Sequence, residues 1–310
     1  MNVSQFEEQI SHKWWQAALA GDFASAWSAS DEIQRAGLCF SNRERWRRSL
    51  WDGSPFVDRN VLLRCWRGLG DAIHFIRYAP LVRAQAGSLT VEAPGVLVPL
   101  LRWVSGIDRL VELDVEDFQN KDYVQIESTE LPYVFRTTLD SIPCKVPYIS
   151  IEESAPGMTT KKLKVGLCWC GGSFDPRRAM HLSDLEPLIR VPEVAFFQLQ
   201  RGVASREAIG SSLRFENLSD CSMDLSVTAS FINSLDVIVS VDTMVAHLAG
   251  ALGKKVYLLL HTEADWRWLK GREDSPWYPT VSILRQFQAG DWKPVVNQLA
   301  YILTRMTTSS

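Results

Sequence analysis

The chain of 310 residues is 46% hydrophobic and 22% charged. These are ordinary globular values, and they exclude a disordered chain, a collagen or a coiled coil as the main state. The 33 Lys and Arg against 36 Asp and Glu leave a net charge of -3, so no bulk charge attracts nucleic acid or anionic lipid, and we expect no nucleic-acid partner. At roughly 100–200 residues per domain, the length predicts two domains or one large one.

The start of the chain and the cysteines favour a cytoplasmic protein. No apolar run reaches the ~20 residues of a transmembrane helix, and Glu7, Glu8 and Asp22 interrupt the region where a signal peptide has its apolar core. We therefore expect no transmembrane segment. Cys168 and Cys170 are closer together than zinc-knuckle ligands usually are, so we predict no metal site. The scattered cysteines are expected to be free thiols; they are Cys39, Cys65, Cys144, Cys168, Cys170 and Cys221.

Residues 1–50 have a helical pattern. Apolar residues recur at helical spacing, for example Leu19, Phe23 and Trp27, and Gly21-Asp22 divides the segment into two helices. The pair resembles one tetratricopeptide unit, and a single unit cannot bury its own apolar face. We favour a structural extension packed on the rest of the protein. A platform for an acceptor or a partner protein is the alternative.

After residue 51, short apolar strands alternate with helical patterns, and this alternation restarts after a polar linker near residues 150–162. The predicted strands are residues 60–66, 88–92, 109–113 and 122–127, then 164–169, 194–199, 237–241 and 255–260. The predicted helices are residues 71–85, 95–104 and 132–139, then 182–189, 226–235, 243–252 and 294–304. The order predicts an α/β protein with two Rossmann-like lobes facing a cleft. We place the lobes at residues 51–155 and 156–310.

A glycine-rich turn follows the first predicted strand. Gly68 and Gly70 permit a tight turn with close backbone approach to a ligand, and Asp71 falls where the next helix begins. Asp71 is therefore a candidate carboxylate at the edge of the sheet. A simple helix-capping role explains the same position equally well.

The second lobe has a similar turn after residues 237–241. Asp242 and Thr243 fit the N-cap and first turn of the next helix, whose free backbone N–H groups suit a diphosphate. His247 lies one turn further along the same face. The alternative is a packing helix with a buried, hydrogen-bonded histidine.

Aromatic residues gather in residues 265–268 and 275–279. Aromatic faces stack on sugar and nucleoside rings, while charged side chains fix hydroxyls and phosphates. A local aromatic core within a folded loop is the alternative. With the glycine turn, these segments supply the cleft candidates Gly70, His74, Asp265, Trp266, Arg267, Trp277 and Tyr278.

Taken in order, these segments resemble glycosyltransferase family 9, which includes the lipopolysaccharide heptosyltransferases, and most closely the glycosyltransferase domains that follow tetratricopeptide repeats. The likeness covers about residues 51–293. It is carried by the segments "LLRCWRGLGDAIHFIRYAPLV", "VPYIS", "KVGLCWCGG", "FFQLQ", "SVDTMVAHLAGALGKKVYLLL", "DWRWL" and "SPWYP".

The resemblance implies a GT-B fold and an inverting, metal-independent transfer of a sugar from a nucleotide-diphosphate donor to a hydroxyl of a glycan or protein acceptor. It implies no cofactor beyond the nucleotide sugar. Asp71 matches the candidate general base, and Arg178 matches a basic residue that faces the donor phosphates. The donor-binding set carried over is Trp169, Arg178, Gln200, Asp242, Thr243, Met244 and His247.

Other functions stay open at this stage. Met244 stands where the family often has a small residue beside the phosphate, and a bulky side chain there suits a catalytically silent binding module. A nucleotide-sugar epimerase shares the architecture by fold analogy alone. The sequence gives no donor base, no donor sugar, no acceptor and no oligomeric state.

Overall fold

The computed structural model describes residues 3–36, 51, 53–118, 122–151, 160–172, 174–216 and 224–308. The predictions for residues 37–50, Cys39, Cys221 and the domain boundary at 155/156 lie outside these residues. The chain forms two compact units, which are described separately. Unit 1 comprises Met1–Cys144 with Asp265–Gly271, and unit 2 comprises Lys145–Ala264 with Arg272–Ser310. Residues 265–271 belong to unit 1 although the residues on either side of them belong to unit 2. The sequence analysis does not predict this.

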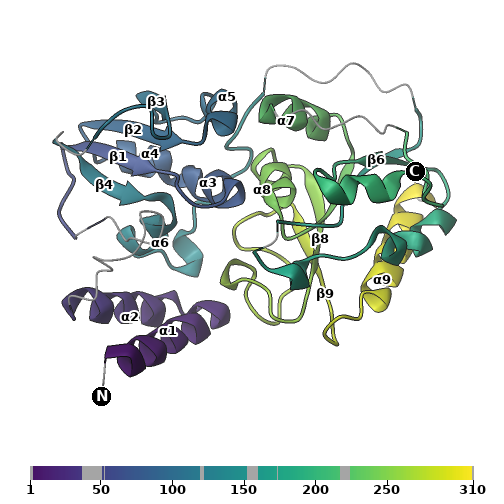
Figure 1. Cartoon of the computed structure of the whole chain (residues 1–310), viewed down its shortest axis with the longest axis horizontal. Coiled ribbons are helices and arrows are strands. Elements are labelled where there is room, and N and C mark those ends of the chain that lie inside the picture. Colours follow the sequence, from purple (N-terminus) through teal and green to yellow (C-terminus); the bar gives the residue numbers. More distant parts are fainter. Residues whose placement is uncertain are drawn as a thin grey trace. The chain divides into compact units, whose positions relative to one another are not determined.

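Unit 1 contains a four-stranded parallel sheet (Figure 1). Its strands run in the order β3-β2-β1-β4, so β1 is central. They are β1 (Asn60–Arg64), β2 (Ser88–Ala93), β3 (Arg109–Glu112) and β4 (Val124–Glu127). The short helices between and after them are α3 (Leu69–Phe75), α4 (Ala79–Arg83), α5 (Val98–Leu101) and α6 (Leu131–Val134).

The helices of unit 1 are shorter than their predicted ranges because prolines interrupt them. The helix predicted at residues 71–85 is α3, a 3₁₀ turn at Ile76–Tyr78, and then α4 with Pro80 in its first turn. Proline lacks a backbone N–H and its ring clashes with the carbonyl four residues earlier. The helix predicted at 95–104 is likewise a 3₁₀ turn followed by one turn of α5.

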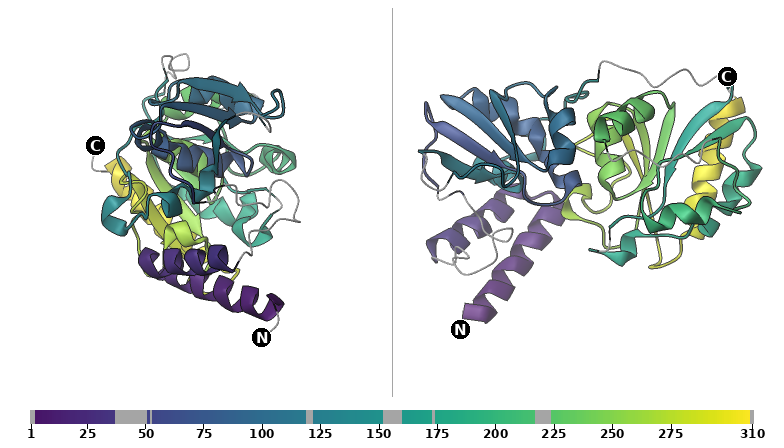
Figure 2. Two further views of the ribbon diagram at one scale, coloured as in Figure 1. Left: turned by 90° about the vertical axis from the view of Figure 1, so that its left-hand side faces the viewer. Right: turned by 45° about the horizontal axis from the view of Figure 1, so that its top comes forward.

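Two longer helices, α1 (Val3–Ala20) and α2 (Phe23–Arg35), precede the sheet and lie side by side (Figure 2). Asp22 caps α2 by accepting a hydrogen bond of 3.1 Å from the Ser25 backbone N–H. The Trp27 indole N–H donates to the Thr137 carbonyl oxygen at 2.7 Å. The pair therefore packs on the body of unit 1, as the sequence predicts, while its likeness to a tetratricopeptide unit stays a prediction.

Unit 2 contains a five-stranded parallel sheet in the order β6-β5-β7-β8-β9. The strands are β5 (Leu163–Cys168), β6 (Val194–Gln198), β7 (Val237–Val241), β8 (Lys255–Leu260) and β9 (Val281–Arg285). Its helices are α7 (Leu225–Asn233), α8 (Met244–Ala251), α9 (Lys293–Thr308) and the 3₁₀ helix Leu182–Arg190, which contains Pro187. The strand β9 is absent from the sequence prediction, and the helix predicted at 182–189 is of the 3₁₀ type.

Helices pack on the sheet of unit 2 and hold the ends of its strands in place. Leu167 of β5 and Val241 of β7 share one core with Leu299 of α9, whereas α8 packs against β7, β8 and α7. Figure 1 shows α8 and α9 on different sides of this sheet. The predicted α/β class, with a parallel sheet in each unit, is confirmed.

Among the described residues, no helix has both the length and the apolar character that crossing a bilayer requires.

Candidate functional site

The start of α8 brings several polar side chains together in unit 2. Thr243 is the N-cap, and its hydroxyl accepts a hydrogen bond of 3.2 Å from the Val245 backbone N–H. The same hydroxyl lies 3.0 Å from the Ser240 hydroxyl, at the end of β7. Asp242 immediately precedes the cap. The first-turn N–H groups of a helix have no intrahelical acceptor and carry partial positive charge, so this end attracts an anion.

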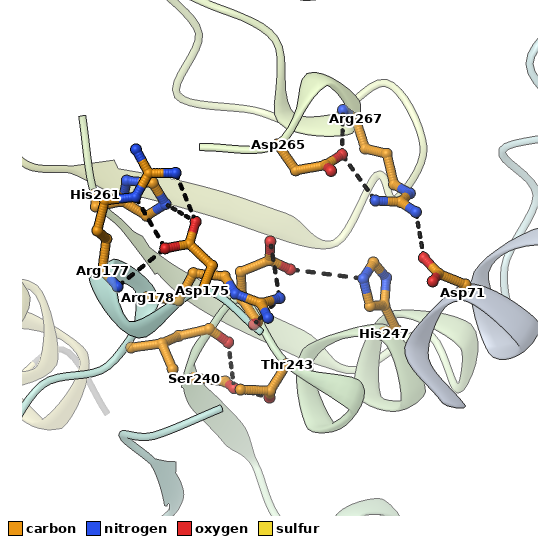
Figure 3. A network of polar contacts seen from close by, with 12 residues as sticks. Asp71, Asp175, Arg177, Arg178, Ser240, Thr243, His247, His261, Asp265 and Arg267 are labelled. Carbon is orange, nitrogen blue, oxygen red and sulfur yellow. Dashed lines mark hydrogen bonds and ion pairs between the residues drawn. The ribbon is translucent and has the colours of Figure 1, made fainter. Parts of the chain in front are cut away.

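Arg178 places a cation beside this helix start (Figure 3). Its Nη1 donates to the Asp242 backbone carbonyl at 3.3 Å and lies 3.9 Å from the Asp242 carboxylate. The side chain is 23% exposed, and its Nε has no hydrogen-bond partner among the described residues. The neighbouring Arg177 turns to two other carboxylates, Asp175 and Glu263. Of the two arginines, Arg178 is the one directed to α8.

A chain of side-chain contacts supports Asp242. The Nε2 of His247 lies 3.6 Å from Asp242 Oδ1, and its Nδ1 lies 3.0 Å from the Tyr278 hydroxyl. His247 and Asp242 are each about one-twentieth exposed. The histidine is therefore buried between two polar partners, and it orients the Asp242 carboxylate. This matches the alternative of a buried, hydrogen-bonded histidine, and a donor-binding role for His247 stays a prediction.

The Gln200 amide is engaged with backbone groups, and its role in the donor site stays a prediction. Its Oε1 accepts hydrogen bonds from the backbone N–H groups of Trp169 and Cys170 at 3.0 and 2.8 Å. Its Nε2 donates to the carbonyls of Cys170 and Arg201, both at 3.0 Å. The buried amide is thus engaged with the backbone, and it holds the loop that follows β5. Gln200 positions this loop, which approaches Thr243 at Gly171.

Two other donor-site predictions have different outcomes. The Trp169 ring is fully buried in the core of unit 2 and packs against Phe215, with ring centroids 6.0 Å apart. It cannot stack on a ligand in this arrangement. Met244 is the first residue of α8 and is partly exposed, so its side chain stands at the helix end where an anion is expected.

In unit 1, Asp71 is the third residue of α3 and is held from two sides. Its Oδ2 accepts a hydrogen bond of 3.3 Å from the Gly68 backbone N–H, and Gly68 is the N-cap. Its Oδ1 forms an ion pair with Arg267, which also binds Asp265 at 2.8 Å (Figure 3). Neither Gly68 nor Gly70 has a positive φ angle. The carboxylate is 26% exposed, so capping and a chemical role are both compatible with its position.

The aromatic cleft candidates form a core rather than a stacking surface. Trp266 packs edge-on against Trp14 and Phe23 in unit 1. In unit 2, Tyr278 lies against Gly250 of α8. This burial matches the alternative of a local aromatic core, because these rings fill the space between elements that are distant in sequence, and a binding role for them stays a prediction. The buried candidates are His74, Trp266, Trp277 and Tyr278.

Sequence reasoning missed a cavity of about 490 Å³ in unit 2, at the carboxyl ends of β8 and β9. His261 follows β8 and Gln286 follows β9, and both line the cavity. Burial lowers the pKa of His261. The charge of Asp175 raises this pKa, whereas the charges of Arg177 and Arg178 lower it further. Recognising the apolar run at residues 281–285 as a strand would have placed Gln286 at the ligand-binding edge of the sheet.

Among the described residues, no three His, Cys, Asp or Glu side chains are grouped to hold a metal ion. The absence of a metal requirement stays a prediction, as does the absence of a cofactor.

The fold has solved counterparts among glycosyltransferases. Glycosyltransferase family 9 from Veillonella parvula is 11% identical, with a TM-score of 0.54 over 83% of this chain and 99% of that one. The E. coli ADP-heptose lipopolysaccharide heptosyltransferase II is 14% identical, with a TM-score of 0.55 over 80% and 99%. The E. coli heptosyltransferase WaaC, solved with ADP, is 11% identical, with a TM-score of 0.52 over 81% and 99%. The likeness confirms the predicted GT-B type of fold.

No family model matches the sequence. A curated relative, the protein FlbA of Caulobacter vibrioides, is 24% identical over 327 aligned positions, which cover 93% of this chain and 54% of FlbA. The chain thus spans about half the length of this relative.

Proposed function

We propose that this chain is a glycosyltransferase that moves a sugar from a nucleotide-diphosphate donor to a hydroxyl group of a glycan or protein acceptor. The observation that carries the proposal is the position of Arg178, a partly buried cation at the start of α8 whose Nε meets no partner among the described residues. A cation beside free helix N–H groups is suited to a diphosphate. The likeness in fold to enzymes solved with ADP supports the choice of donor.

The chemistry of transfer needs a stabilised leaving group and a base for the acceptor proton. The acceptor oxygen attacks the anomeric carbon, a new C–O bond forms, and the bond from that carbon to the phosphate oxygen breaks. The electron pair leaves with the nucleoside diphosphate, whose growing negative charge Arg178 and the α8 N–H groups stabilise. The acceptor proton passes to a carboxylate, for which we propose Asp71. Attack opposite the leaving group inverts the anomeric carbon, and this scheme uses no metal.

Asp71 has the fixed orientation that a general base needs. Gly68 holds one carboxylate oxygen and Arg267 the other. An oxygen atom has more than one lone pair, so each can accept a further hydrogen bond from an acceptor hydroxyl. In this proposal Arg267 is a positioning residue, and Asp265 fixes Arg267 in turn.

Turnover of ADP-, GDP- and UDP-sugars by the purified chain, with and without a hydroxyl acceptor, tests the proposal. Asp71→Asn preserves the shape of the side chain and removes its basicity, so transfer should fall by roughly 100-fold or more while nucleotide affinity is retained. The matched control is Asp265→Asn, which leaves the Asp71 carboxylate in place and should cost less. Equal transfer by wild type and Asp71→Asn would remove Asp71 as the base.

A catalytically silent nucleotide-sugar-binding module is the second candidate, and the position of Met244 favours it. The side chain begins α8, where a donor phosphate would lie. Met244→Gly tests the crowding directly. Two results together would support the silent module over the enzyme. Met244→Gly would bind the donor more tightly than the wild type, and the wild type would transfer sugar from none of the donors tested.

A further inference from the structure

The cavity in unit 2 shares no lining residue with the proposed diphosphate site. Its lining comes from three segments: the stretch Arg177–Asp184, the turn after β8 and the turn after β9. None of the residues proposed to hold the diphosphate lines it. Its volume of about 490 Å³ lies within the ~300–1,000 Å³ of small-molecule sites, and it occupies the sheet edge where α/β folds bind ligands.

Gln286 lines this cavity and is almost fully buried. The residue is 4% exposed. Its amide oxygen accepts a hydrogen bond of 3.1 Å from the Gly290 backbone N–H, and this bond fixes which end is oxygen. Its amide nitrogen has no acceptor among the described residues. A buried donor without an acceptor is costly, so the cavity is suited to a ligand that supplies an oxygen.

The charges around the cavity disfavour an anionic ligand. The Arg177 guanidinium binds Asp175 through two hydrogen bonds of 2.9 Å and also pairs with Glu263. Asp184 and Glu263 add two carboxylates to the lining. His261 Nδ1 accepts from the Glu263 backbone N–H at 3.3 Å and Nε2 faces Asp175 at 3.7 Å (Figure 3), an arrangement of the neutral ring. A phosphate would therefore meet carboxylates and a cation that is already paired.

The remaining lining fits an uncharged ring that carries hydroxyl groups. Trp292, Met180 and Ala289 provide apolar wall, whereas Asp184 and Thr262 provide hydroxyl-binding oxygens. A sugar ring presents C–H groups to apolar surfaces and hydroxyls to amides and carboxylates. We propose that this cavity is a second saccharide subsite, which binds a neutral sugar unit independently of the nucleotide. The choice of a saccharide over another polyol rests on the proposed function.

Ligand-observed NMR titration of the full chain with methyl glucoside, methyl mannoside, methyl galactoside and N-acetylglucosamine tests this inference. At least one should bind, and Gln286→Leu should weaken that binding about tenfold, which is the loss of one good hydrogen bond. Because Gln286→Leu also removes the hydrogen bond from Gly290, a second variant, Ala289→Tyr, fills the cavity from an exposed position and should abolish binding. Both variants should bind ADP, GDP or UDP as the wild type does.

The outcomes separate this inference from the proposed function. No glycoside binding by a folded wild type overturns the subsite, as does glycoside binding that neither Gln286→Leu nor Ala289→Tyr reduces. Competition between glycoside and inorganic phosphate for the cavity also overturns it. Failure to bind any nucleoside diphosphate, with glycoside binding intact, contradicts the donor site and leaves the saccharide subsite standing.

Discussion

Arg178 reaches the start of α8 through the backbone of Asp242 as well as through its carboxylate. The Nη1-to-carbonyl distance is 3.3 Å, and the Nη1-to-carboxylate distance is 3.9 Å. The carbonyl fixes the guanidinium without neutralising its charge, and the one carboxylate that offsets this charge lies further away, at 3.9 Å. The arrangement distinguishes Arg178 from Arg177, whose charge two carboxylates offset.

This difference gives a matched pair of variants. Arg178→Ala should weaken nucleoside diphosphate binding by about tenfold or more, because a hydrogen bond to a charged group is worth roughly 1.5–3 kcal/mol. Arg177→Ala removes the same side chain one residue earlier and should change the affinity by less than about threefold. Calorimetry with ADP, GDP and UDP measures both, and equal losses would mean that bulk charge alone governs binding.

Gly250 should not tolerate a side chain. A Cβ there would lie 2.5 Å from Cδ1 of Tyr278, in a fully buried contact. Alanine normally stabilises a helix interior by about 1 kcal/mol relative to glycine, but overpacking here should reverse the sign and cost on the order of 1–3 kcal/mol of unfolding free energy. Urea denaturation measures this, and Tyr278→Leu in the same chain should recover part of the loss. A more stable Gly250→Ala would show that Tyr278 does not pack here.

Gln200→Leu should act on stability. Four hydrogen bonds connect its amide to the backbone of the loop after β5 and to its own chain neighbour. Removing the amide leaves buried backbone groups without partners and should lower the unfolding free energy by about 2 kcal/mol or more. A direct donor-binding role would instead reduce nucleotide affinity and leave stability unchanged, so denaturation and calorimetry on one variant discriminate the two.

His261 should make stability depend on pH. Burial lowers its folded-state pKa, so on acidification the unfolded chain takes up a proton first, near its ordinary pKa of about 6.5. The unfolded state then binds more protons, and the unfolding free energy falls as the pH drops below about 6.5 while staying level above it. His261→Gln should flatten this dependence in urea denaturation. His12→Gln, at an exposed position on α1, is the control, and equal slopes in all three proteins would exclude His261 as the cause.

Local patterns predicted the start of α8 and every described strand except β9. The apolar run before Asp242 and the capping threonine are short-range signals, and the structure places both as expected. Proline positions, once weighed, explain why the helix at residues 71–85 is broken. These features depend on a few neighbouring residues, which a single sequence displays in full.

Contacts between segments distant in sequence determine the surroundings of several predicted site residues, and these contacts could not be predicted from the sequence. Trp266 lies in an aromatic and charged segment of the kind that binds sugars, but its ring packs against Trp14, which is distant in sequence. Gln200 lies at the ligand-binding edge of the sheet, yet its amide is engaged with the backbone. Neither outcome follows from spacing, because both depend on which segments meet in the fold. The cavity beside Gln286 was missed for the same reason, since it forms where three separated segments converge.

Crystallography of the chain with a bound nucleoside diphosphate tests the central claim most directly. The account predicts diphosphate oxygens within hydrogen-bond distance of the first-turn N–H groups of α8 and of Arg178. A diphosphate bound away from residues 242–244, or Met244 occupying that position while the nucleotide lies elsewhere, would contradict it.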